Sequence, residues 1–131
     1  VYPASIQSNI AINTVVDIVF GTEAFDQGNN FASNTFTAPV TGKYQLNVSL
    51  DLDAVDVDAG FYQIKITTSN QTYNKTFDPN FAADPQQWVF GLSVLADMDA
   101  SDTALIQIYQ SGGSAQADVA VASNFSGFLA C

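Results

Sequence analysis

Carboxylates are the side chains of this sequence that could do chemistry. Thirteen acidic residues stand against three basic ones, and the chain contains no histidine. One acidic cluster consists of Asp51, Asp53, Asp56 and Asp58. A second acidic cluster consists of Asp97, Asp99 and Asp102. Calcium prefers hard oxygen ligands such as these, so both clusters are candidate calcium sites.

The first acidic cluster does not have the spacing of an EF-hand loop. Counting from Asp51 puts Val55 where a ligand belongs and Tyr62 where a bidentate glutamate belongs. Aspartate in turns also bonds to its own backbone, so both clusters can equally be ordinary solvated turns. Structural calcium is therefore the one cofactor that the sequence leaves open. Zinc is not expected, because histidine is absent and Cys131 is the single cysteine.

Catalysis is not expected of this chain. Without histidine there is no imidazole base and no Ser-His or Cys-His pair, and no arginine is present to clamp an oxyanion. Two carboxylates across a cleft can hydrolyse a glycoside, but no spacing in the sequence marks such a pair. We therefore predict a protein that is not an enzyme.

Charge and hydropathy also exclude two classes of partner. The formal net charge of -10 repels phosphate backbones, and no basic stripe is present to neutralise them, so nucleic-acid binding is not expected. No apolar run approaches the roughly 18 residues that a membrane-spanning helix needs, so membrane insertion is not expected.

The elements that position the carboxylates are predicted to be short antiparallel strands. Runs of β-branched and aromatic residues are separated by Gly, Pro, Asn and Asp roughly every 8–12 residues, which is typical of a sandwich or barrel. The predicted strands are residues 6–12, 15–20, 34–38, 43–52, 61–69, 71–77, 87–96, 104–110 and 124–130. The length favours a single domain, residues 1–131.

Two of these strands differ in their pattern. From Tyr44 to Leu52 apolar and polar residues alternate, so the apolar ones should face the core and the polar ones should face outward. From Trp88 to Leu95 both faces are apolar. A strand in a two-layer sandwich has one core side, so its other face needs cover from a loop or from another copy. This pattern favours an oligomer.

Several short motifs follow one another in a fixed order. They are Phe20, Phe25-Asp26, Asn29-Asn30-Phe31, residues 35–44 (Thr-Phe-Thr-Ala-Pro-Val-Thr-Gly-Lys-Tyr), residues 100–103 (Ala-Ser-Asp-Thr) and residues 124–129 (Asn-Phe-Ser-Gly-Phe-Leu). In this order the set resembles the globular head of complement C1q, which shares its jelly roll with tumour necrosis factor. The resemblance runs from about Val15 to the end of the chain. One departure is Ser101-Asp102, where the family usually has Gly-Asp.

The resemblance implies an all-β fold: an antiparallel, two-sheet jelly-roll sandwich of about ten strands that assembles as a homotrimer. It also implies a protein that works by binding. The residues that match structural core and turn positions of the family are Phe36, Gly42, Tyr44, Phe125, Gly127 and Phe128. The residues expected at the trimer seam are Trp88, Phe90, Asn47, Ser49, Phe125 and Phe128. Some members hold calcium near the trimer axis, where the outward face ending at Asp51 would converge from three copies.

Two functions are compatible with this resemblance. The first is a trimeric recognition head that contacts a cell-surface glycan or protein through loops 53–60, 78–86 and 111–118. The second is a decoration or cement protein of a phage particle, which contacts other virion proteins and has no soluble ligand. Residues 28–39 are similar to segments of bacteriophage and bacterial surface proteins, so the expected location is extracellular or on a virion surface.

Overall fold

Ten strands and their connecting loops make up the computed structural model, which describes residues 1–131. The strands are β1 (Val15–Asp17), β2 (Phe31–Ala32), β3 (Thr35–Thr37), β4 (Gly42–Asp53), β5 (Phe61–Thr68), β6 (Thr72–Phe77), β7 (Gln87–Met98), β8 (Thr103–Ser111), β9 (Asp118–Val119) and β10 (Asn124–Leu129). No helix has the length and apolar character that crossing a membrane requires.

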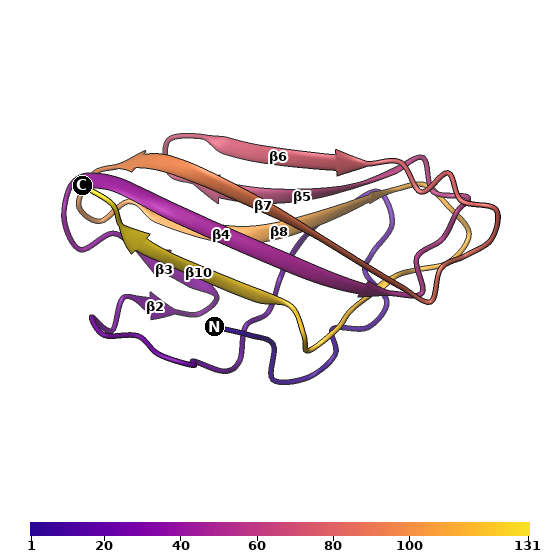
Figure 1. Cartoon of the computed structure of the whole chain (residues 1–131), viewed down its shortest axis with the longest axis horizontal. Coiled ribbons are helices and arrows are strands. Elements are labelled where there is room, and N and C mark those ends of the chain that lie inside the picture. The colour runs from indigo at the N-terminus through magenta and orange to yellow at the C-terminus, as the bar shows by residue number, and fades with distance from the viewer.

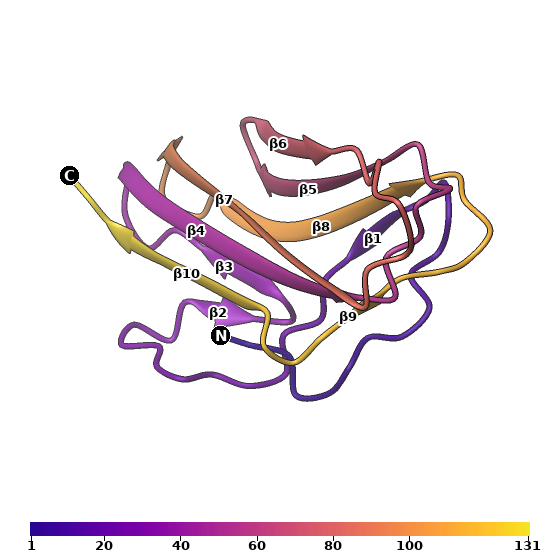
Figure 2. The same ribbon diagram turned by 45° about the vertical axis from the view of Figure 1, so that its right-hand side comes forward.

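The strands form two antiparallel sheets that face one another (Figures 1 and 2). The six-stranded sheet has the order β2-β3-β8-β5-β6, and β1 also pairs with β8. The four-stranded sheet has the order β10-β4-β7, and β9 also pairs with β4. Strands that are distant in sequence are thus neighbours in both sheets, and the predicted antiparallel sandwich is confirmed.

One predicted strand is wrong and two observed strands were not predicted. Residues 6–12 make only isolated bridges, at Gln7 and Ile12. The φ angles of Asn9 (58°) and Asn13 (57°) lie in the left-handed region, which interrupts an extended chain. β2 and β9 have two residues each, too few to leave an alternating pattern in the sequence.

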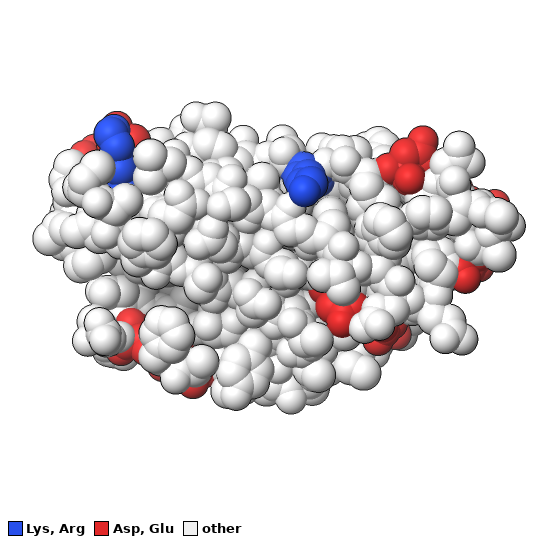
Figure 3. Space-filling model, in the orientation of Figure 1, with Lys and Arg blue, Asp and Glu red and all other residues white.

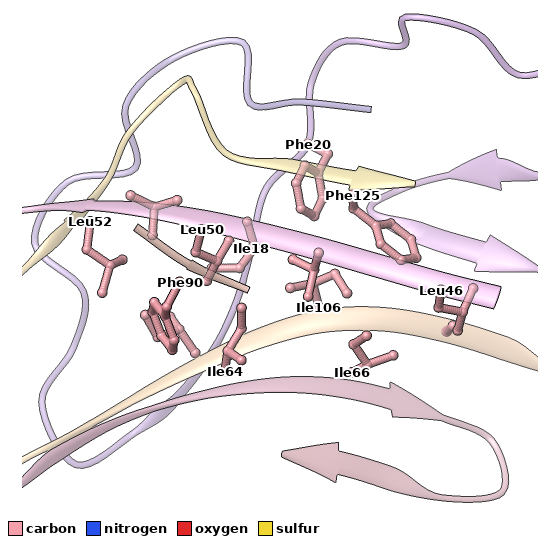
Figure 4. Packing of buried hydrophobic residues seen from close by; sticks show 14 of the residues in the cluster. Ile18, Phe20, Leu46, Leu50, Leu52, Ile64, Ile66, Phe90, Ile106 and Phe125 are labelled. Carbon is pink, nitrogen blue, oxygen red and sulfur yellow. The ribbon is translucent and has the colours of Figure 1, made fainter. Parts of the chain in front are cut away.

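The hydrophobic core lies between the sheets (Figure 4). Leu46, Leu50 and Leu52 of β4 are almost fully buried, as are Ile64 of β5 and Ile106 of β8. Burying one such side chain stabilises the fold by roughly 1.5–3 kcal/mol. The alternation predicted for β4 is therefore confirmed, because its even-numbered residues point into this core.

Three aromatic rings close the core beside β10. The ring centroids of Phe20 and Phe125 lie 6.1 Å apart, and Phe31 lies 6.3 Å from each of them. Figure 4 shows Phe20 and Phe125 close together at this end of the cluster. Rings at such separations attract one another beyond the gain from burial alone.

Three loops meet at one end of the sandwich, on the right in Figure 1. They connect β4 to β5 (residues 54–60), β6 to β7 (residues 78–86) and β8 to β9 (residues 112–117). They correspond closely to the three loops that the sequence predicts as contact loops. The C-terminus lies at the opposite end. We refer to the three loops together as the loop end.

Candidate recognition surfaces

Asp56 ties two loops of the loop end together. One of its carboxylate oxygens, Oδ2, accepts the backbone N–H groups of Ser114 (2.6 Å) and Ala115 (2.7 Å). The other, Oδ1, accepts the N–H of Asp58 at 2.8 Å. Only 3% of Asp56 is exposed. Asp56 therefore anchors the backbone of the loop end and is not itself presented to a ligand.

The environment of Asp56 keeps its carboxyl group ionised. Burial acts to raise its pKa, but the hydrogen bonds from the backbone of Ala115, Asp58 and Ser114 outweigh burial, and the pKa lies below its ordinary value. The N–H of Asp56 in turn donates to the hydroxyl oxygen of Tyr62 at 2.9 Å. Burial raises the pKa of Tyr62, so this phenol stays neutral.

The loop between β6 and β7 (residues 78–86) is fastened to the loop between β4 and β5 (residues 54–60) by two further hydrogen bonds. The N–H of Val57 donates to Oδ1 of Asp84 at 2.9 Å, and the N–H of Ala54 donates to the carbonyl oxygen of Gln86 at 3.1 Å. Exposed polar side chains project from this frame, among them Asp58, Asn80, Gln86, Ser114 and Gln116. Acidic residues are visible at this end in Figure 3, whereas the visible lysines lie elsewhere. The loop end is thus a braced, polar and acidic surface.

The structure disperses the candidate calcium ligands. Nowhere do three or more acidic side chains gather into a group that could hold a metal ion. Asp56 is occupied by backbone groups, and Asp53 lies opposite Asp118 in the pairing of β4 with β9. In the second acidic cluster the carboxylate of Asp102 accepts the backbone N–H of Asp99, so it caps its own turn. One copy therefore offers no ligand set, and calcium stays a prediction.

Asp51 differs from the other aspartates of the first acidic cluster. It is buried on the outer side of β4, where its Oδ2 atom accepts the side-chain amide of Gln87 at 2.6 Å. Its Oδ1 atom is buried and has no hydrogen-bond partner. An unpaired buried acceptor costs roughly 1–3 kcal/mol, so this oxygen is a place where a donor or cation from outside the chain would be favourable.

The outer face of the four-stranded sheet is a second candidate surface. Ser93 lies opposite Asn47, and its hydroxyl donates to Oδ1 of Asn47 at 2.5 Å. The side-chain amide of Gln45 donates to the hydroxyl oxygen of Ser93 at 2.8 Å. Apolar residues flank this polar ladder: Val89 is 57% exposed, Leu95 53% and Phe128 61%. We call this surface, including Ser49, the outer face.

Three of the six residues expected at the trimer seam do not lie on the outer face. Trp88 and Phe90 are opposite Leu52 and Leu50 of β4, so they share the core side of the sheet. Phe90 and Phe125 are buried core residues. Trp88 packs against Phe81 and Phe77, with ring centroids 4.8 and 5.7 Å away. Asn47, Ser49 and Phe128 do lie on the outer face.

The sequence did not single out Val89 and Leu95 for the outer face. The sequence does show that Val89 and Leu95 lie on the opposite face of the strand from Trp88 and Phe90, because successive side chains alternate. Only the pairing of β7 with β4 shows that Val89 and Leu95 are on the outward face. β7 is also the edge strand of its sheet and has 12 residues. A long edge with unpaired backbone groups invites pairing or packing with another chain.

A pocket of about 390 Å³ lies beside β10 and is the third candidate surface. Most of its lining is apolar and comes from Phe25, Phe31, Phe36, Tyr44, Leu46, Phe125 and Leu129. Loop 25–30 forms one wall, and Asp26 closes this loop by accepting the N–H groups of Asn30 (3.0 Å) and Phe31 (2.9 Å). These hydrogen bonds lower the pKa of Asp26, so its carboxylate stays charged at the pocket. We call this pocket the β10 groove.

Comparisons with known proteins agree with this architecture. A family model described as the C1q domain matches residues 1–130. The fold is similar to that of the globular domain of zebrafish complement 1qA protein, with a TM-score of 0.66 and 16% sequence identity. That match covers 97% of this chain and 94% of the zebrafish chain, and at such identity it shows the fold alone. The predicted jelly roll is thereby confirmed. A comparison with curated proteins gives no match.

Proposed function

Because this chain belongs to the C1q domain family, we propose that it is a homotrimeric module that recognises a ligand outside the cell. The C1q globular domain is a non-enzymatic recognition module, and C1q domains are typical of extracellular proteins. The observation that carries the proposal is the outer face, where Val89 and Leu95 of β7 and Phe128 of β10 are exposed, together with the edge of β7 that no other strand pairs.

The chemistry of the outer face suits contact between copies. Its apolar residues gain roughly 25 cal/mol for each Å² that is removed from water. Three polar atoms between them, Gln45 Nε2, Ser93 Oγ and Asn47 Oδ1, are already bonded within the chain and so cost little to bury. Gln45 Oε1 and Asn47 Nδ2 are free to form hydrogen bonds with a neighbouring copy. Three copies that pack the β7 edge against the outer face of a neighbour would cover both features at once.

The loop end is the surface that we assign to ligand contact. Its backbone is fixed by Asp56 and Asp84, so binding would order few additional groups. Its amide and hydroxyl side chains suit the hydrogen-bonding groups of a glycan or a protein surface. Its acidic character, together with the net charge of -10, favours neutral or basic partners.

The decoration of a phage particle remains the alternative that the sequence suggests. The two roles differ in an observable way. A recognition head binds cells or glycans as an isolated protein, whereas a cement protein binds only when the other virion proteins are present.

Two measurements on the purified chain test the proposal. Sedimentation equilibrium should give a mass of about 42 kDa, three times the 14.0 kDa of one chain. A glycan array and whole-cell binding should then give a signal that alanine substitutions of Asn80 and Gln86 weaken. A stable species of 14.0 kDa at working concentration would contradict the assembly. A trimer that binds neither glycans nor cells would contradict the recognition role.

A further inference from the structure

One acceptor atom of the four-stranded sheet lacks a partner within the chain. Oδ1 of Asp51 is the single buried side-chain oxygen or nitrogen without a hydrogen bond. Only 4% of Asp51 is exposed, and its Oδ2 atom already accepts the side-chain amide of Gln87. Its backbone N–H donates to Ser123 and its carbonyl oxygen accepts from Ala120. A buried carboxylate that meets one neutral amide is costly, and a cation at Oδ1 would offset that cost.

Two of the three lysines of the same chain are placed elsewhere. Lys43 lies near the other end of β4 and pairs with Asp97, with Nζ and Oδ1 3.6 Å apart. Lys65 alternates with buried residues of β5, so it projects from the outward side of the six-stranded sheet. There it donates to Oδ1 of Asn74 at 3.3 Å. Neither lysine supplies a cation to the four-stranded sheet beside Gln87.

The surroundings of Asp51 do not depend on what precedes Val1. Val1 and Phe125 exchange both backbone hydrogen bonds, as an antiparallel pair does. Any residues before Val1 would therefore pass Gly127 and Leu129, at the end of β10 that is distant from Asp51. Residues in that place would lie away from the unpaired oxygen.

Lys75 is the one basic side chain without a hydrogen bond or ion pair inside the chain. It lies opposite Ile64, which is fully buried, so its side chain leaves β6 on the core side of the sheet. Tyr73 and Phe77, two positions to either side, pack against the core, whereas Lys75 is exposed. Because β6 is an edge strand, this cation emerges at the open side of the sandwich.

β6 and β7 together form one flank of the sandwich. Each is the edge strand of its sheet, and both lie on the upper side in Figures 1 and 2. Phe77 of β6 and Phe90 of β7 connect them, with ring centroids 4.7 Å apart. The packing proposed above places the edge of β7 against the outer face of a neighbouring copy. The same packing brings Lys75 to the sheet face that holds the unpaired oxygen of Asp51.

The lysine and the aspartate lie at compatible levels along the strands. A rotation axis along the strands keeps each residue at the same height in every copy. Phe90 is opposite Leu50, so its contact with Phe77 puts Phe77 level with Leu50. Lys75 comes two residues before that level and Asp51 one residue beyond it, which separates them by about 10 Å along the strands. The four-carbon stem of lysine, the aspartate side chain and one hydrogen bond together span such a distance.

We propose that Lys75 of one copy forms a salt bridge with Asp51 of the next copy. Cyclic symmetry repeats this contact three times, and each copy gives one cation and receives one. Charge complementarity favours this occupant, because a chain with a net charge of -10 has few cations to offer. The contact rests on the proposed trimer and names the residues that set its register. A trimer without the contact would leave the proposed function intact.

Neutral variants test the contact by sedimentation equilibrium. Lys75→Met keeps an apolar stem and removes the charge, so the overall dissociation constant of the trimer should rise at least about tenfold for each contact. Lys65→Met is the matched control, because Lys65 projects from the opposite sheet, and a change within about threefold is expected. Asp51→Asn should weaken the trimer as Lys75→Met does. The double substitution should weaken it little further than either alone, as expected for residues in contact.

A carbodiimide tests the contact on the natural chain. This reagent joins an amine to a carboxylate, with loss of water, where the two groups touch. Isotope-labelled and unlabelled chains are mixed at a dilution that dissociates the trimer, reconcentrated and then treated. Mass spectrometry should find a peptide pair that joins Lys75 of one isotope to Asp51 of the other.

Three results would overturn the proposal. One is a Lys75→Met trimer that is as tight as the Lys65→Met trimer. Another is a cross-link of Lys75 to Asp51 only within one chain, or to other carboxylates only. The third is larger assemblies of Lys75→Met, because Lys75 would then serve to guard the edge of β6 against pairing. If one of these comes with a trimer that still binds glycans or cells, this inference fails and the proposed function stands, whereas a natural chain that stays at 14.0 kDa overturns both.

Discussion

The Oδ2 atom of Asp56 lies 2.6 Å from the backbone nitrogen of Ser114, a residue 58 positions later in the chain. This hydrogen bond and its two companions hold the loop end. Asp56→Ala leaves three N–H groups without their charged acceptor, so we expect the free energy of unfolding to fall by about 3 kcal/mol in urea denaturation. Asp58→Ala is the control: its side chain is exposed, and a change within about 0.5 kcal/mol is expected. Equal effects of the two substitutions would contradict the anchoring role.

Acid should weaken the same anchor. The pKa of Asp56 is lower in the folded chain than its ordinary value, so the carboxylate stabilises the fold above about pH 4, and this contribution is lost as the pH falls through the folded pKa. Asp56→Asn cannot titrate. The stability difference between the natural chain and this variant should therefore shrink between about pH 5 and pH 2. A pH-independent difference in urea midpoints would show that charge is not what Asp56 contributes.

A charge on the outer face should separate the copies. Leu95→Asp places a carboxylate among the apolar residues expected to be buried between copies, and we predict a folded monomer of 14.0 kDa in sedimentation. Val40→Asp is the matched control, because Val40 is similarly exposed but lies in the turn before β4. Val40→Asp should leave the trimer intact. Dissociation of both variants would place the seam elsewhere.

Substitution of Phe125 should weaken the fold of the monomer and substitution of Phe128 should weaken the trimer, although only two residues lie between them. Phe125 belongs to the core, so Phe125→Ala should lower the free energy of unfolding by about 3–5 kcal/mol. Phe128 points outward, so in the monomeric Leu95→Asp background Phe128→Ala should cost less than about 1 kcal/mol. In the natural background Phe128→Ala should raise the dissociation constant of the trimer. A large loss of monomer stability from Phe128→Ala would contradict its outward position.

Chelation decides the calcium prediction. No three carboxylates gather in one copy, so we expect EDTA to leave the Tm unchanged. The informative contrary result is a fall in Tm that calcium reverses and that Asp51→Asn abolishes. That outcome would place an ion between copies, at the buried Oδ1 atom that lacks a partner within the chain.

Local patterns predicted the strands well wherever those strands are long. The alternation from Tyr44 to Leu52 fixed which residues of β4 are buried, because every second side chain must face the same sheet surface. The region from Trp88 to Leu95 was recognised as apolar on both sides, and it is: Phe90 is in the core and Leu95 is exposed on the outer face. The sequence alone did not show which face of this strand meets the core, because that depends on the long-range pairing of β7 with β4.

The candidate surfaces were harder to predict because they join distant segments. Asp56 and Asp58 look alike in the sequence, yet Asp56 is buried under backbone groups that come from beyond residue 110. The β10 groove combines loop 25–30 with residues 126–129, and no local pattern connects them. Residues 6–12 have a strand-like composition, but Asn9 adopts a left-handed conformation that composition does not reveal.

The loop end is fastened mainly through main-chain atoms and two aspartates, Asp56 and Asp84. Ala82, Ala83 and Asp58 are exposed at its surface, and their side chains take no part in this fastening. Such positions can accept many amino acids without loss of foldability. Related chains could therefore diversify their targets by changing these few residues alone, and an engineer could randomise the same positions as a display scaffold.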